Sequence, residues 1–300
     1  MHALRTRQES SCGRRSQAPV ALLRQRAPAA ALALAAAALA PALAPALALG
    51  AAAREGSRAE RAQALENPCL GPAASALRCP DLVMRPPAEL TIDRRTRPGR
   101  VLLRAANSID NVGTGPVELR GRRDGRATMS VRQRIYRANG SRLSVPTRAR
   151  LSFYPIPGQY RYWKVRQAAR FELWSLDARG RRARLVRTGP KLHYCFRDLE
   201  RRNPSGRSPR RRVYPACDQS ARTRAVTLGT SVGWSDSYPA SYHEQWIDVT
   251  GLRGRFAYAQ VADPGNGIFE AREDNNGSQA LITLPLRDGR ERGDRAREGY

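Results

Sequence analysis

Histidine and lysine are scarce in this 300-residue sequence. Only His193 and His243 lie beyond the N-terminal region, and only Lys164 and Lys191 are lysines among 53 basic residues. Two histidines are too few for a three-histidine metal site. Arginine keeps its proton in proteins, whereas lysine can lose it and react as an amine. The two lysines therefore mark positions where a guanidinium group would not serve.

Acidic residues are also few, and the formal net charge is +27. Such a charge favours polyanionic partners: nucleic acid, a phosphate-rich envelope polymer or an acidic protein. The preference for arginine, together with abundant alanine and glycine, is equally typical of a GC-rich coding bias. Both interpretations remain open.

The N-terminal region predicts export. An arginine-rich leader precedes an uncharged run of alanine and leucine over residues 27–53, which ends in Ala51, Ala52 and Ala53. We interpret residues 1–53 as a cleaved signal peptide and expect a secreted or envelope-exterior protein. A retained membrane anchor is the alternative, but Pro41 and Pro45 interrupt the run, so we expect no stable span. Residues 54–78 read as a linker, and 287–300 as a disordered charged tail.

Four cysteines follow the leader: Cys69, Cys79, Cys195 and Cys217. An even number in an oxidising compartment predicts two disulfides. Three pairings are possible, and local closure favours Cys69–Cys79 and Cys195–Cys217. A zinc site is the alternative, but the sequence has no Cys-x-x-Cys pair.

Short apolar runs predict an all-β fold. Alternation puts Val131, Gln133 and Ile135 on one strand face, and no helical periodicity persists after residue 70. The segment 107–115 is rich in turn-forming residues, and we expect strands to flank it. The loop 197–212 holds seven arginines and is either a solvated charged loop or a phosphate-binding arm. A β-sandwich with long loops over residues 79–286 is the predicted architecture. The remaining strands are expected at 81–84, 100–104, 115–119, 171–176, 255–262 and 281–284.

Several segments in a fixed order carry a family resemblance. The most specific is Gln245-Trp-Ile-Asp-Val-Thr250, and the others are 79–87, 160–173, 188–198, 231–238 and 270–276. Together they resemble the catalytic domain of the lysyl oxidase family in its bacterial form. The resemblance implies a copper amine oxidase on a β-sandwich, which converts primary amines, often protein lysines, to aldehydes. It also implies a lysyl tyrosylquinone cofactor, made here from Lys191 and Tyr238.

The family's copper motif is His-x-His-Trp-His, and the segment that matches it begins at Tyr160. Trp163 is kept, but Tyr160, Tyr162 and Lys164 stand at the three histidine positions. Tyrosine is a poor copper ligand unless it is ionised, and an ammonium group would repel the metal. We therefore do not expect the family's copper site here.

A rebuilt copper site is the alternative. It would use His193 and His243, with Asp236 or Glu244 as a carboxylate ligand. A histidine that stands alone in its segment is, however, more often an ordinary polar residue.

The family also has a calcium site that ties its first strand to its last turn. Oxygen ligands of that kind suit a hard cation. Arg272 replaces one acidic position, so a hydrogen-bonded turn without metal is the alternative. The matching positions are Asp81, the Leu82 carbonyl, Glu270, Asn275 and Asn276.

Three functions follow from these patterns. The favoured one is a secreted lysyl-oxidase-like protein that is catalytically impaired and retained as an extracellular binding domain, with an acidic envelope polymer or protein as partner. The second is an active amine oxidase that acts on a primary amine or protein lysine through a Lys191–Tyr238 quinone. The third is an exported binder of polyanions or nucleic acid.

Overall fold

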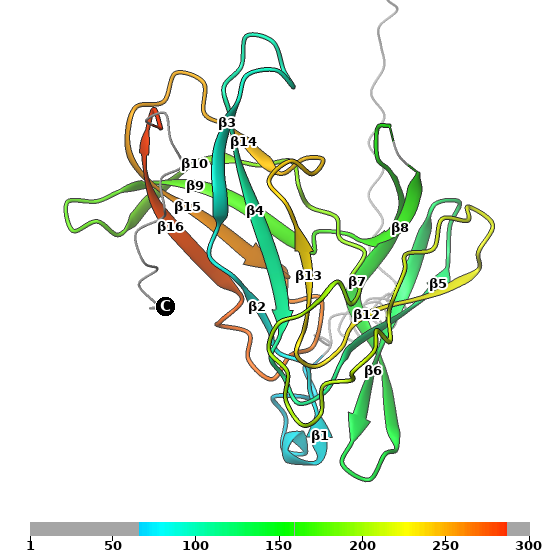
Figure 1. The fold of residues 1–300 in the computed structure, drawn as a ribbon. Coiled ribbons are helices and arrows are strands. Elements are labelled where there is room, and N and C mark those ends of the chain that lie inside the picture. Colours follow the sequence, from blue (N-terminus) through cyan, green and yellow to red (C-terminus); the bar gives the residue numbers. More distant parts are fainter. Residues whose placement is uncertain (1–65, 159, 287–300) are drawn as a thin grey trace, which may run out of the picture. The chain divides into compact units, whose positions relative to one another are not determined.

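The computed structural model describes residues 66–158 and 160–286 (Figure 1). The predicted signal peptide, the first part of the predicted linker and the predicted disordered tail lie outside these residues. Within the described ranges, no helix is long and apolar enough to cross a membrane.

The described chain is all-β, as predicted, with one 3-10 helix, η1 (Ala74–Ala76). One sheet has the order β12 (Ala225–Thr230), β5 (Val117–Arg123), β6 (Thr128–Arg137), β7 (Arg142–Pro155), β8 (Arg161–Val165), and β1 (Leu77–Arg78) pairs with β6. A second sheet has the order β10 (Arg182–Thr188), β9 (Ala169–Leu176), β15 (Gly254–Ala262), β16 (Gly277–Leu284). The third has the order β11 (Glu200–Arg201), β13 (Trp234–Tyr238), β4 (Leu102–Asn111), β14 (Trp246–Asp248), and both β2 (Leu82–Met84) and β3 (Ala88–Asp93) pair with β4.

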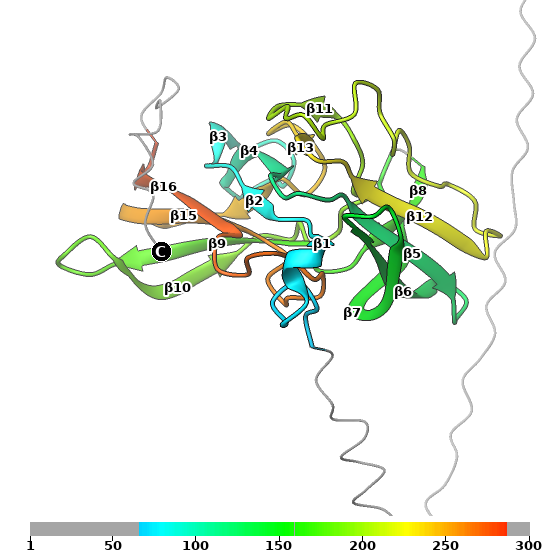
Figure 2. The ribbon, with the colours of Figure 1, turned by 90° about the horizontal axis from the view of Figure 1, so that it is seen from below.

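The strand pattern follows from alternation. Val131, Gln133 and Ile135 are all buried on one face of β6, as predicted. Gln133 is tolerated there because its amide group exchanges two hydrogen bonds with the backbone of Phe269. The view of Figure 2 separates the sheet that contains β6 from the sheet of β9, β15 and β16.

Several strands, among them β7, β10 and β12, lie outside the predicted runs, and one predicted strand is longer than expected. Residues 107–111 were predicted as part of a turn-rich segment, yet they continue β4 to Asn111. The Asn111 amide donates to the carbonyls of Gly115 and Thr230, so its polar side chain is satisfied inside the sheet. Tertiary partners thus outweigh the turn preference of asparagine.

A single large core joins the three sheets, with Trp163, Phe171, Tyr194 and Tyr258 fully buried within it. Burying each large apolar side chain stabilises the fold by about 1.5–3 kcal/mol. This core surrounds the segment between β10 and β11, which carries the candidate site.

Both predicted disulfides are present. Cys69 bonds to Cys79, and Cys195 bonds to Cys217. Residues 66–78, which the sequence assigned to a linker, belong to the fold, because β1 pairs with β6 and Cys69 is buried. Two disulfides are in keeping with an oxidising compartment.

Candidate functional site

Two segments that are far apart in the sequence bring Lys191 and Tyr238 together. Tyr238 ends β13, which pairs with β4, and Lys191 follows the turn after β10. Gly189 permits that turn, since a Cβ atom there would lie 2.6 Å from the carbonyl oxygen of Trp246. The Gly189 N–H donates to the Phe171 carbonyl and fixes the start of the segment.

Three tyrosine rings surround the Lys191 amine. Its Nζ lies 4.7 Å from the ring centre of Tyr194, 4.6 Å from that of Tyr238 and 4.7 Å from that of Tyr242. The rings also contact one another, with centres 5.1 Å apart for Tyr194–Tyr238 and 4.7 Å for Tyr238–Tyr242. These distances are within the range of cation–π attraction. We call these four residues the lysine cage.

The amine in the lysine cage is poorly solvated. Lys191 is 1% exposed, and among the described residues no carboxylate lies within ion-pair distance of it. Burial and, to a smaller extent, the positive charge of Lys164 lower the pKa of Lys191 to about 7, whereas Asp236 acts in the opposite direction. A substantial fraction of Lys191 is therefore a neutral, nucleophilic amine at neutral pH.

Asp236 is the buried acid nearest to this chemistry. Burial raises its pKa to about 7, while the charges of Arg197 and Lys191 oppose the rise. Its Oδ2 accepts a hydrogen bond of 3.3 Å from the Tyr238 hydroxyl, and its Oδ1 has no partner among the described residues. Burial, followed by the Asp236 charge, raises the pKa of Tyr238 well above 10, so the phenol stays protonated.

A chain of side-chain amides fixes the tyrosines. The Asn107 amide donates to the Tyr194 hydroxyl at 2.9 Å, and the Gln245 amide donates to the Asn107 oxygen at 2.6 Å. Gln245 also reaches the Tyr238 carbonyl at 3.5 Å. Gln245 opens the family-like block, and its part in the structure is to orient the lysine cage.

The residues that match the family's copper histidines differ in their exposure to solvent. Tyr160 is 68% exposed, whereas Lys164 is 3% exposed and points toward the lysine cage. The Lys164 Nζ lies 5.5 Å from the ring centre of Tyr154 and 5.9 Å from that of Tyr242. Burial lowers the pKa of Lys164 to about 8, against the opposing charges of Glu244 and Asp236. Two phenols and an ammonium do not form a copper ligand set.

The histidines of the rebuilt alternative lie near one acid. His193 stacks on Tyr154 with ring centres 4.3 Å apart, and the Tyr154 hydroxyl donates to Glu244 at 2.6 Å. His243 Nε2 lies 3.4 Å from the same carboxylate. Even so, within residues 66–158 and 160–286 no three His, Cys, Asp or Glu side chains are grouped so that they could hold a metal. Lys164 is close enough to lower the pKa of His193, after the larger effect of burial.

A small hollow gives the lysine cage its contact with the surface. It has a volume of about 270 Å³ and is lined by Tyr238, Asn107 and Ser237, with Arg85 and Arg202 among its charged residues. Tyr238 itself is 6% exposed. Tyr238 thus borders the hollow, whereas Lys191 does not line it.

The calcium positions do converge, and hydrogen bonds join them. Asn275 donates to Asp81 and Asn276 donates to Glu270, each at 2.8 Å, and the Leu82 N–H donates to Glu270 at 2.5 Å. The buried oxygens Asn275 Oδ1 and Asn276 Oδ1 have no partner among the described residues. Their chemistry fits a hard cation, which would draw on amide oxygens and the Leu82 carbonyl as well as carboxylates.

Several residues of these sites were missed from the sequence. Glu273 and Asn67 join the calcium positions through a 2.6 Å hydrogen bond, and Asp263 raises the pKa of Glu270, after the larger effect of burial. Tyr194 and Tyr242 were not foreseen as walls around Lys191. Tyr194 lies only three residues from Lys191, and Tyr242 four from Tyr238, so their proximity was the one available signal.

Comparison with known proteins adds no identification: no family model matches the chain, and no curated protein is significantly similar to it.

Proposed function

We propose that this protein is a secreted lysyl-oxidase-like domain that has lost copper-dependent amine oxidation and is retained for extracellular binding. One observation carries the proposal: Lys164, which by resemblance matches a copper-binding histidine, is buried beside the lysine cage. A cation there, beside the partly protonated Lys191, opposes the entry of a second positive ion. The two disulfides support the extracellular setting.

Metal content and quinone staining test the loss of oxidation. The exported wild-type protein, produced with copper in the medium, should contain no stoichiometric copper and give no redox-cycling stain. Stoichiometric copper together with a positive stain would overturn the proposal.

A triple variant, Tyr160→His, Tyr162→His and Lys164→His, tests the proposal more directly by placing histidines at the three positions. If these replacements rebuild the copper site, quinone should form between Lys191 and Tyr238. The matched control is Tyr160→Phe, Tyr162→Phe and Lys164→Met, which removes the phenols and the charge without adding imidazole. This control should remain free of copper and quinone.

Amine oxidation is the second candidate, because Lys191 Nζ lies 4.6 Å from the Tyr238 ring. A quinone made from these two residues would supply the electrophilic carbonyl that a substrate amine attacks. Before that cross-link formed, burial would keep part of Lys191 neutral, so that its amine could add to an oxidised Tyr238 ring, and would exclude bulk water. Substrate could approach through the small hollow beside Tyr238.

Binding of an anionic envelope polymer is supported by the outward face of the sheet of β5, β6 and β7. Arg120 and Arg132 are direct partners across β5 and β6, and both are exposed. Like charges directly opposite each other destabilise a sheet. Glu118 Oε1, 3.9 Å from Arg120, offsets part of this repulsion, and an anionic partner would offset the rest. The same face carries Arg122 and Arg148, which have no ion-pair partner among the described residues.

The double variant Arg120→Gln/Arg132→Gln tests this face with inorganic polyphosphate as the probe. Polyphosphate affinity should fall and become less salt-dependent, while thermal stability should rise slightly. Arg179→Gln/Arg184→Gln, on the turn and strand after β9, is the matched control. Equal losses in both variants would assign binding to net charge alone, and tighter binding of DNA than of polyphosphate would favour a nucleic-acid partner.

A further inference from the structure

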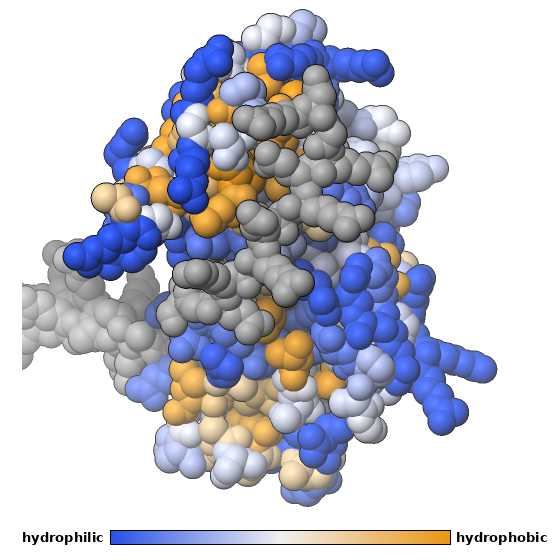
Figure 3. All heavy atoms as spheres, turned by 60° about the vertical axis from the view of Figure 1, so that its left-hand side comes forward, coloured by the Kyte–Doolittle hydropathy of each residue, from blue (hydrophilic) through white to orange (hydrophobic). Residues whose placement is uncertain are grey.

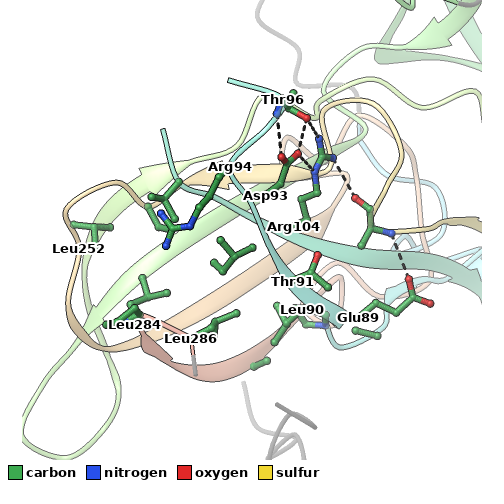
Figure 4. Close-up of a pocket in the computed structure, with 18 of the residues that line it drawn as sticks. Glu89, Leu90, Thr91, Asp93, Arg94, Thr96, Arg104, Leu252, Leu284 and Leu286 are labelled. Carbon is green, nitrogen blue, oxygen red and sulfur yellow. Dashed lines mark hydrogen bonds and ion pairs between the residues drawn. The ribbon is translucent and has the colours of Figure 1, made fainter. Parts of the chain in front are cut away.

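A large cavity opens between the edges of two sheets, away from the lysine cage. It has a volume of about 1550 Å³ and lies between β3 and β16, with the β14–β15 connection on its wall (Figure 4). Among the described residues, β3 pairs only with β4 and β16 only with β15, so no strand of that part of the chain closes this side. Ligand pockets commonly measure about 300–1,000 Å³, and this cavity therefore has room for a sizeable ligand.

The floor of the cavity is apolar and continuous with the core. Leu90 and Leu284 are 5% and 3% exposed, and both belong to the main core cluster. Leu252 and Leu286 are partly buried against that cluster. In Figure 4 these leucines lie around the cavity together with Arg94. Figure 3, which brings this side of the molecule forward, shows apolar side chains gathered beside hydrophilic ones.

Positive charge dominates the rim. Arg94, Arg95 and Arg253 line the cavity, and in the described part of the chain none of their side chains has an acidic partner. Asp93 is already held by Arg104, whose Nε lies 2.7 Å from its Oδ2. The remaining acid, Glu89, accepts a 3.5 Å hydrogen bond from the Ala240 N–H. The free charges at the rim thus complement an anion.

From this arrangement we infer that the cavity between β3 and β16 binds a single-chain amphiphile with an anionic head group. The alkyl chain lies along Leu90, Leu252 and Leu284, and a carboxylate head lies among the rim arginines. Burial of the chain supplies most of the affinity, and the guanidinium groups set the polarity and orientation.

Calorimetry on the full mature chain tests this, with decanoate and dodecanoate below their micelle concentrations. One molecule should bind per chain, and dodecanoate should bind roughly tenfold more tightly, since each buried methylene contributes about 0.8 kcal/mol. Dodecyltrimethylammonium, with the same chain and a cationic head, should bind much more weakly. Absence of saturable dodecanoate binding to the folded protein, or equal binding of the cationic amphiphile, would overturn the inference.

Two pairs of variants locate the site. Leu252→Asp should weaken dodecanoate binding at least tenfold, whereas Leu281→Asp, at a 40% exposed position of β16 outside the cavity lining, should leave it unchanged. Arg94→Gln/Arg253→Gln should reduce the preference for the anionic head, and Arg184→Gln should not. Circular dichroism confirms that each variant is folded. Binding that survives Leu252→Asp in a folded protein would place the amphiphile elsewhere and refute the proposal.

Discussion

The Nζ atom of Lys191 lies 4.6 Å from the ring centre of Tyr238, inside a cage that two further tyrosines complete. The structure thus brings together the two residues that the sequence had singled out as cofactor precursors. A second buried lysine, Lys164, lies close enough for its charge to lower the pKa of Lys191. The predictions below follow from these buried charges and their supports.

Stability should rise with pH above neutrality. On folding, the pKa of Lys191 falls from 10.5 to about 7, so between these values the unfolded chain binds a proton that the folded chain lacks. The free energy of unfolding therefore increases as pH rises from about 7 to 10, by at most about 4 kcal/mol. Lys191→Met should flatten this rise in urea titrations, whereas Arg187→Met, at an exposed position of β10, should not. An unchanged slope in Lys191→Met would contradict the assigned burial effect.

Lys164 should act on Lys191 through its charge. The positive charge of Lys164 lowers the pKa of Lys191, so Lys164→Met should raise it and move the stability rise to higher pH. The pH dependence of the Lys191 side-chain resonances, followed by NMR of protein with isotope-labelled lysine, measures this shift without a reagent having to reach the buried amine. Arg161→Gln, at an exposed position of the same strand, is the control and should leave the profile in place. A profile that moves equally in both variants would show a general effect of net charge.

The hydrogen-bonded side-chain amides of Gln245 and Asn107 should stabilise the fold and hold the tyrosines of the lysine cage in place. Gln245→Leu leaves the Asn107 oxygen without its 2.6 Å donor, and we expect a loss of about 1–3 kcal/mol in the free energy of unfolding. Asn139→Ala, at an exposed turn, should cost much less. Chemical denaturation measures the free energy of unfolding of both variants. An equal decrease in the two would contradict a special role for Gln245.

Calcium should stabilise the turn that joins β2 to the chain before β16. Burial raises the pKa of Glu270 well above its usual range, and burial also raises that of Glu273 to about 7. Calcium would displace these protons, so its stabilising effect on the melting temperature should grow between about pH 6 and 8.

Glu270→Gln should abolish the calcium response, and Asp274→Asn, whose side chain is 83% exposed, should retain it. A melting temperature that calcium does not change at pH 8 would leave the turn as a purely hydrogen-bonded element.

The sequence predicted those features that depend on residues close together in the chain. The alternation of β6 and the short loops between paired cysteines suffice for a strand face and for both disulfides. It could not predict contacts fixed by distant segments, such as Asn67 beside Glu273. Asn111 was misplaced for the same reason, because its amide also donates to the carbonyl of Thr230, which is distant in the sequence.

The candidate site shows the same division. Lys191 stood out by its rarity, but the burial that lowers its pKa depends on Tyr194 and Tyr242, and no composition or spacing rule assigns tyrosines to such a cage. Lys164 was expected to oppose copper at its own position. That its side chain points inward and lowers the pKa of Lys191 could be seen only in the folded structure.

Peptide mapping of the exported wild-type protein, after exposure to copper and air, tests the central claim most directly. The account predicts that the peptides carrying Lys191 and Tyr238 separate at their unmodified masses, with both disulfides intact. A peptide in which Lys191 is covalently joined to an oxidised Tyr238 would contradict it, and would show that the oxidase chemistry survives despite Lys164.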